Sequence, residues 1–88
     1  MNLVEITQFT EQALRGALGS ELIGDVSVSV EPSDDGSEWL DIMVTSPDER
    51  LPSARQSIDA SRLLRHGLEA RGETRFPNVL FTTAAEDA

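Results

Sequence analysis

Asp59 and His66 are the two residues of this chain whose spacing comes closest to a catalytic pair. They are seven residues apart, which places both side chains on the same face of a helix at about 100° per residue. A carboxylate that holds an imidazole can support general-base chemistry, but such machinery also needs a nucleophile within reach. The neighbouring Ser57 and Ser61 fall toward the opposite, core-facing side, and the chain contains no cysteine, tyrosine or lysine. We therefore predict that the protein is not an enzyme.

Four carboxylates gather near a predicted turn in the first half of the chain, and they are Asp34, Asp35, Glu38 and Asp41. A calcium loop needs oxygen ligands at regular positions over about twelve residues, closed by a bidentate glutamate. The four acids lack that spacing, and the chain also lacks a glycine-rich phosphate loop. We predict no metal site and no cofactor. The carboxylates are expected either to keep the turn solvated or to contact a basic partner.

The charges are distributed unevenly along the 88 residues. Residues 1–49 contain eleven acids and one arginine, whereas residues 50–75 contain six arginines and three acids, and the whole chain carries a formal charge of −9. Such a surface repels nucleic acid and anionic membranes over most of its area. The charge therefore favours a basic protein partner. It disfavours nucleic acid without excluding it.

The first half of the chain predicts one helix and one hairpin. Apolar side chains recur at three- and four-residue steps over residues 3–18, which indicates a helix with one buried stripe. Valine alternates with serine in residues 25–31, and residues 39–45 show a second alternation, so both segments are expected to be strands. Residues 32–37 supply the turn between them. The side chains expected to face the core are Val26, Val28, Val30, Leu40, Ile42 and Val44.

The longest helical pattern lies within residues 51–75, where Pro52 is expected in the first turn and Gly72 is expected to end the helix. One side carries small and aliphatic residues that allow close packing on a sheet. The opposite side is a polar stripe that contains Arg55, Asp59, Arg62 and His66. Residues 76–83 are predicted to form a third strand, which Pro77 opens.

These elements predict a compact αββαβ domain of the α+β class, with a three-stranded mixed sheet and two helices on one of its faces. The domain is expected to span residues 1–83, and residues 84–88 are expected to be a flexible tail. A right-handed crossover follows if the third strand pairs parallel to the second, but the sequence leaves strand order and pairing open. Trp39 and Met43 point away from the predicted core, so we expect them on an open sheet face, with Leu80 as a further candidate.

The element order is that of a type II KH-like domain, and the last third invites a narrower comparison. The residues that carry it are Ala60, Ser61, Leu63, Leu64, Arg65, Leu68, Arg75, Pro77, Leu80 and Phe81. This pattern resembles the C-terminal helix and last strand of bacterial ribosome-binding factor A. The resemblance implies a helix–kink–helix, a closing strand entered through arginine and proline, and contact with ribosomal RNA. RNA contacts would come from Arg55, Arg62, Arg65 and Arg75, because the guanidinium fork donates two bonds to a phosphate. Internal neutralisation of this stripe by Asp59 is the alternative.

Three functional hypotheses remain. The first is a small acidic interaction domain of the inhibitor, immunity-protein or antitoxin type, which docks on a basic protein. The second is a KH-like domain that associates with RNA or the ribosome. The third is a structural subunit, including a homodimer, that uses the Trp39 face. No apolar run approaches the roughly 18 residues of a membrane span, and the N-terminus lacks the pattern of a signal peptide, so we expect a cytoplasmic protein without membrane contact.

Overall fold

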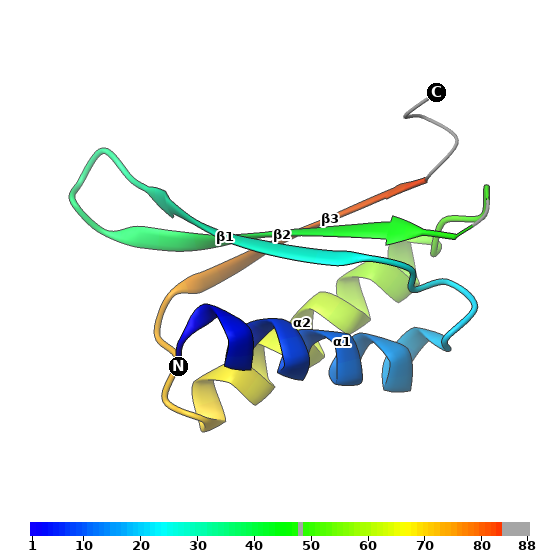
Figure 1. The fold of residues 1–88 in the computed structure, drawn as a ribbon, viewed down its shortest axis with the longest axis horizontal. Coiled ribbons are helices and arrows are strands. Elements are labelled where there is room, and N and C mark those ends of the chain that lie inside the picture. Colours follow the sequence, from blue (N-terminus) through cyan, green and yellow to red (C-terminus); the bar gives the residue numbers. More distant parts are fainter. Residues whose placement is uncertain (48, 84–88) are drawn as a thin grey trace.

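The computed structural model describes residues 1–47 and 49–83, and it has two layers, a sheet and a pair of helices (Figure 1). The elements follow one another as α1 (Leu3–Leu18), β1 (Val26–Pro32), β2 (Glu38–Ser46), α2 (Ala54–Ala70) and β3 (Phe76–Thr83). Both helices lie on the same face of the sheet, and among the described residues no helix or further strand packs on the other face (Figure 1). The predicted α+β class and αββαβ order are confirmed. The predicted tail, residues 84–88, lies outside the described residues.

The three strands form a mixed sheet in the order β1-β2-β3. β1 pairs antiparallel with β2 through the hairpin, with Val30 opposite Leu40. β3 returns after α2 and pairs parallel to β2, with Val79 opposite Ile42. A parallel pair needs a crossover of a dozen or more residues, and α2 supplies it. The pairing that the sequence left open is therefore resolved, with β2 as the central strand.

The core lies between the sheet and the helices. Its buried apolar residues are Ile6, Leu14, Ile23, Leu40, Ile42, Val44, Ala60, Leu64 and Leu68. The three from β2 alternate along the strand, as predicted, because successive side chains of a strand point to opposite faces. The valines of β1 are only half-buried. This difference is consistent with their position on an edge strand.

Both helices begin with a capping box. In this motif the side chain of the N-cap residue accepts a hydrogen bond from the backbone N–H three residues later, and the side chain of that later residue accepts one from the N-cap backbone N–H. Asn2 and Glu5 form the box of α1, and Ser53 and Gln56 form that of α2. The prediction that Pro52 lies in the first turn was wrong, because Ser53 is the N-cap and Pro52 precedes it. The predicted end near Gly72 was close, since α2 ends at Ala70 and Gly72 adopts φ 90° just beyond it.

Candidate functional site

The uncovered face of the sheet carries the most exposed apolar side chains of the central strand. Trp39 is 44% exposed and Met43 is 37% exposed, whereas the intervening core-facing side chains of β2 are fully buried. Two partly exposed residues of β3 lie beside them in register: Phe76 pairs with Trp39, and Leu80 pairs with Met43. The sequence-based prediction placed Trp39, Met43 and Leu80 here. Together with Phe76 at the edge, we call these four residues the open-face patch.

The polar residues of this face are acidic or neutral. Asp41 lies between Trp39 and Met43 on β2, and its register partners are Ser29 on β1 and Asn78 on β3. Glu31 is the register partner of Trp39, and its carboxylate accepts a hydrogen bond of 3.3 Å from the Ser29 hydroxyl. The outward positions of the three strands include no arginine, histidine or lysine. The face therefore combines exposed apolar surface with negative charge.

The four acids predicted to bind a partner are not equivalent. Asp35 Oδ1 accepts hydrogen bonds from the Ser37 hydroxyl at 2.6 Å and from the Ser37 backbone N–H at 2.9 Å. These bonds lower the pKa of Asp35 from 3.8 to about 2, because they stabilise the charged form. Asp35 therefore organises the hairpin turn, which projects beyond the helices at the left of Figure 1.

Glu38 also has an intramolecular partner. It lies two residues before the core-facing Leu40 on β2, so both side chains point to the same face of the sheet. Its carboxylate lies 3.8 Å from Nη1 of Arg75. Asp34 at the exposed hairpin tip and Asp41 on the open face have no hydrogen bond or ion pair within residues 1–47 and 49–83. Of the four predicted acids, these two are the ones with carboxylates left available to a partner.

Three of the four arginines in the predicted RNA-binding set are paired with acids. Arg55 contacts Asp59 at 3.2 Å, and Arg65 contacts Glu69 at 3.1 Å. Each is an exposed pair four residues apart on α2, of the kind that contributes only a few tenths of a kcal/mol. Arg75 pairs with the buried Glu73. The predicted neutralisation of Arg55 by Asp59 is observed.

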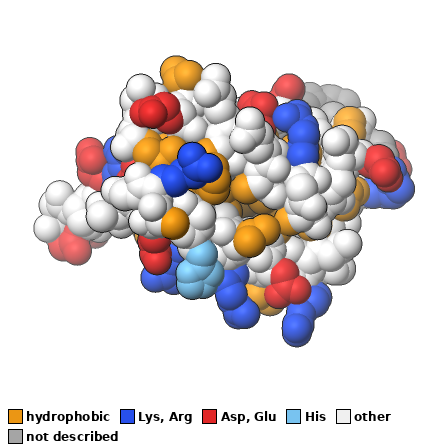
Figure 2. Space-filling view, turned by 90° about the horizontal axis from the view of Figure 1, so that it is seen from below, with side chains coloured by type: hydrophobic (Ala, Val, Ile, Leu, Met, Phe, Trp, Pro, Cys, Tyr) orange, Lys and Arg blue, Asp and Glu red, His pale blue; other side chains and the backbone are white. Residues whose placement is uncertain are grey.

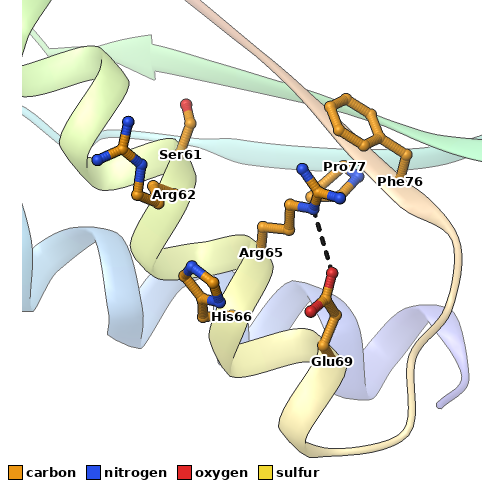
Figure 3. Close-up of a pocket in the computed structure, with 7 residues that line it drawn as sticks. All are labelled: Ser61, Arg62, Arg65, His66, Glu69, Phe76 and Pro77. Atoms are coloured by element: carbon orange, nitrogen blue, oxygen red, sulfur yellow. Dashed lines mark hydrogen bonds and ion pairs between the residues drawn. The ribbon is translucent and has the colours of Figure 1, made fainter.

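Arg62 is the fourth arginine, and it has no ion-pair partner among the described residues. It lines a shallow surface hollow of about 400 Å³ between α2 and β3, together with Ser61, Arg65, His66, Glu69, Phe76 and Pro77. In Figure 3 the side chains of Arg62 and His66 point away from Arg65, which reaches toward Glu69 and Phe76. The Arg65 guanidinium lies 5.1 Å from the centroid of the Phe76 ring. Figure 2 shows the helix side, where arginines lie next to the single histidine.

The candidate catalytic pair Asp59 and His66 is not assembled in this hollow. Asp59 is not among the lining residues that include His66, and the Asp59 carboxylate is paired with Arg55. Within the described part of the chain no group of three or more potential ligands is placed to hold a metal ion. No helix among the described residues is long and apolar enough to cross a membrane.

Two features escaped the sequence reasoning. Phe76 was assigned to the third strand but not to the open face, because strand order was unknown and its register with Trp39 could not be derived. The sequence patterns do not single out Glu73, yet this carboxylate is only 4% exposed. The two-residue spacing of Glu73 and Arg75 was the available signal, because side chains two apart in an extended segment lie on the same side.

Comparisons with known proteins do not extend this description. No family model matches the chain, and neither the curated proteins nor the solved structures yield a match. The resemblance to ribosome-binding factor A therefore remains a prediction. The structure has one uninterrupted helix from Ala54 to Ala70, where that resemblance implies a helix–kink–helix.

Proposed function

We propose that the protein is a small non-enzymatic interaction domain that binds a basic protein partner through its open sheet face. The observation that carries the proposal is the combination on one face of the open-face patch and the carboxylates of Glu31 and Asp41. No outward position of the strands holds a cation, and Arg65 of α2 contacts the patch at the Phe76 ring at the sheet edge, 5.1 Å from its centroid. Exposed apolar surface supplies the favourable desolvation on binding. The carboxylates favour a partner that carries arginine or lysine around its own apolar surface.

The net charge supports the same class of partner. At −9 the domain attracts cationic proteins over a distance comparable to the Debye length, which accelerates encounter at low salt. Asp34, at the projecting hairpin tip, adds to this field. Inhibitors, immunity proteins and antitoxins use acidic surfaces in this way to bind basic partners. We propose that this domain belongs to that broad functional class, without naming a particular partner.

A selection experiment tests the proposal. The immobilised domain is used to enrich binders from a random peptide library, and the enriched peptides are tested against Asp41→Asn and Trp39→Ala variants. We expect enrichment of peptides that combine basic and apolar residues, with binding that weakens in both variants and at higher salt. The matched control is Glu21→Gln, which removes one exposed carboxylate in the loop between α1 and β1, outside all three strands. Enrichment without basic residues, or equal binding to all variants, would overturn the proposal.

RNA binding through the hollow between α2 and β3 is the second proposed function. The observation that favours it is Arg62, which lacks an acidic partner among the described residues and lines the same hollow as His66 and the exposed Phe76. The pairing of Arg55, Arg65 and Arg75 with acids counts against it. Retention on single-stranded RNA at low salt, lost in Arg62→Ala, would support this function. Absence of retention at low salt would exclude it.

A further inference from the structure

The open face has two apolar ends and a polar centre along the strand direction. Trp39 and Phe76 are paired at one end, and Met43 and Leu80 are paired at the other. Phe76 lies at the sheet edge, where its ring also contacts Arg65 of α2. Between the two pairs lie Asp41 and its partner Asn78. A complementary partner element must therefore offer an apolar contact, then a basic group, then a second apolar contact.

The spacing of these contacts follows from strand geometry. At about 3.3 Å per residue, Trp39 and Met43 lie about 13 Å apart along β2, with Asp41 about midway. An α-helix rises about 1.5 Å per residue, so positions seven or eight residues apart are separated by about 10–12 Å on one side of the helix. A residue four positions after the first of these two lies on the same side of the helix. The two apolar pairs of the open face, with Asp41 and Asn78 between them, thus span about the length of two helical turns.

We propose that the element that docks on the open face is an amphipathic α-helix of a partner protein. Its two apolar anchors are about seven or eight residues apart, and an arginine or lysine between them reaches Asp41. This inference rests on the proposed function and adds the form and the residue pattern of the partner. The docked helix would give the sheet a second helical cover, so that the three-stranded sheet is packed on both faces.

Two other occupants fit the face less well. A single extended segment could match the same spacing, but lying on the face it would have no strand beside it, and its buried backbone N–H and C=O groups would be unpaired. A helix satisfies those groups internally. A second copy of this chain, docked face to face, would bring Glu31 and Asp41 of one copy toward the same acids of the other, and this repulsion disfavours it.

Trp39 is the only tryptophan of the chain, so its fluorescence reports on this face when the probe peptides contain no aromatic residue. We would use three synthetic peptides of identical composition. The helical peptide has two leucines seven residues apart and an arginine four residues after the first leucine. The shifted peptide moves one leucine by two positions, which rotates it by about 200° around the helix. The extended peptide places leucine, arginine and leucine at alternate positions.

The proposal predicts that the helical peptide binds about tenfold more tightly than the shifted peptide, which corresponds to about 1.4 kcal/mol. Circular dichroism should show a gain of helix on binding. Leu80→Ala and Asp41→Asn should each weaken the helical peptide several-fold. The matched controls are Leu63→Ala and Glu21→Gln, because Leu63 on α2 is 54% exposed and Leu80 is 53% exposed.

The outcomes separate this inference from the proposed function. If all three peptides bind equally, or the extended peptide binds best, and face variants still weaken them, the helical partner is excluded while binding at the open face stands. If no peptide binds, or the face variants bind like the parent, both proposals fail. If sedimentation shows a dimer at low salt that Leu80→Ala disperses, the face is a self-interface and the inference is overturned.

Discussion

Glu73 and Arg75 form a two-pronged ion pair in the loop that joins α2 to β3. Nε of Arg75 donates to Oε2 of Glu73 at 2.9 Å, and Nη2 donates to Oε1 at 3.0 Å. The backbone N–H of Arg75 also donates to Oε2, at 2.9 Å. The carboxylate is only 4% exposed, and Nη2 also lies 3.3 Å from the carbonyl oxygen of Met1. The pair thus links the entry of β3 to the start of the chain.

Replacement of Glu73 by glutamine should lower the free energy of unfolding by about 2–3 kcal/mol at pH 7, because a charge-assisted pair is lost. Arg75 then keeps the longer ion pair with Glu38 and the hydrogen bond to the Met1 carbonyl oxygen. Urea unfolding at constant m-value measures the change. Arg62→Ala is the control, since this exposed side chain has no described ion pair and should change stability by no more than about 0.5 kcal/mol. Equal effects of the two substitutions would show that the Glu73–Arg75 pair does not stabilise the fold.

The free energy of unfolding should decrease as the pH is lowered, because this same carboxyl group becomes protonated. Hydrogen bonds from Arg75 are the largest cause that lowers the pKa of Glu73 from 4.5 to about 2 in the folded protein. A depressed folded-state pKa stabilises the fold above the unfolded-state value, and the contribution, about 3 kcal/mol, is lost as the pH falls from about 5 to 2.

Unfolding of the parent and of Glu73→Gln in urea across this pH range measures that contribution. We expect the difference in stability between them to be largest near neutral pH and to vanish near pH 2. Asp35, whose pKa is also lowered to about 2, contributes in the same direction, so Asp35→Asn provides a comparison. A difference between the parent and Glu73→Gln that persists unchanged at pH 2 would contradict the assignment.

Local patterns predicted the elements well. The alternation of valine with serine and the alternation in residues 39–45 identified the hairpin, because an antiparallel pair with one buried face shows period two directly in sequence. The apolar stripes identified both helices, because a helix with one buried side shows its period of 3.6 directly in sequence. The open positions of Trp39 and Met43 followed from strand parity alone.

Long-range pairing was not predictable from those patterns. Whether β3 pairs with β1 or β2, and in which direction, depends on how α2 crosses the sheet, and no local pattern encodes that choice. The register of Phe76 with Trp39 and the burial of Glu73 both depend on it. The role of Asp35 was missed for a different reason, since its hydrogen bonds to Ser37 make it part of the turn rather than a free carboxylate.

Thr10 has a hydroxyl that is buried without a hydrogen-bond partner among the described residues. Burial of an unpaired hydroxyl costs about 1–3 kcal/mol. Thr10→Val keeps the shape and removes the hydroxyl, so we expect the free energy of unfolding to rise by about 1 kcal/mol. Thr7→Val is the control, because the Thr7 hydroxyl donates to the Leu3 carbonyl at 2.7 Å and should not show the gain. A loss of stability in Thr10→Val would indicate that the hydroxyl has a partner.

Two helical glycines should respond in opposite directions to the same substitution. A Cβ at Gly16 of α1 meets no atom within 4 Å, whereas a Cβ at Gly67 of α2 would collide with the ring of Phe9. Gly16→Ala should therefore raise the free energy of unfolding by about 0.5–1 kcal/mol through helix propensity. Gly67→Ala gains the same helix propensity, but the new methyl group displaces the Phe9 ring. The Arg71 guanidinium lies 4.5 Å from the centroid of this ring. Overpacking of this kind costs about 1–3 kcal/mol.

Thermal unfolding of both variants tests this difference in sign. We expect a higher Tm for Gly16→Ala and a lower Tm for Gly67→Ala. The double variant Gly67→Ala with Phe9→Leu separates the collision from other effects, because a smaller side chain at position 9 makes room for the new methyl group. The double variant should lose less stability than the sum of its single substitutions. If Gly67→Ala stabilises the domain as Gly16→Ala does, the close approach of α2 to Phe9 is not a constraint on helix packing.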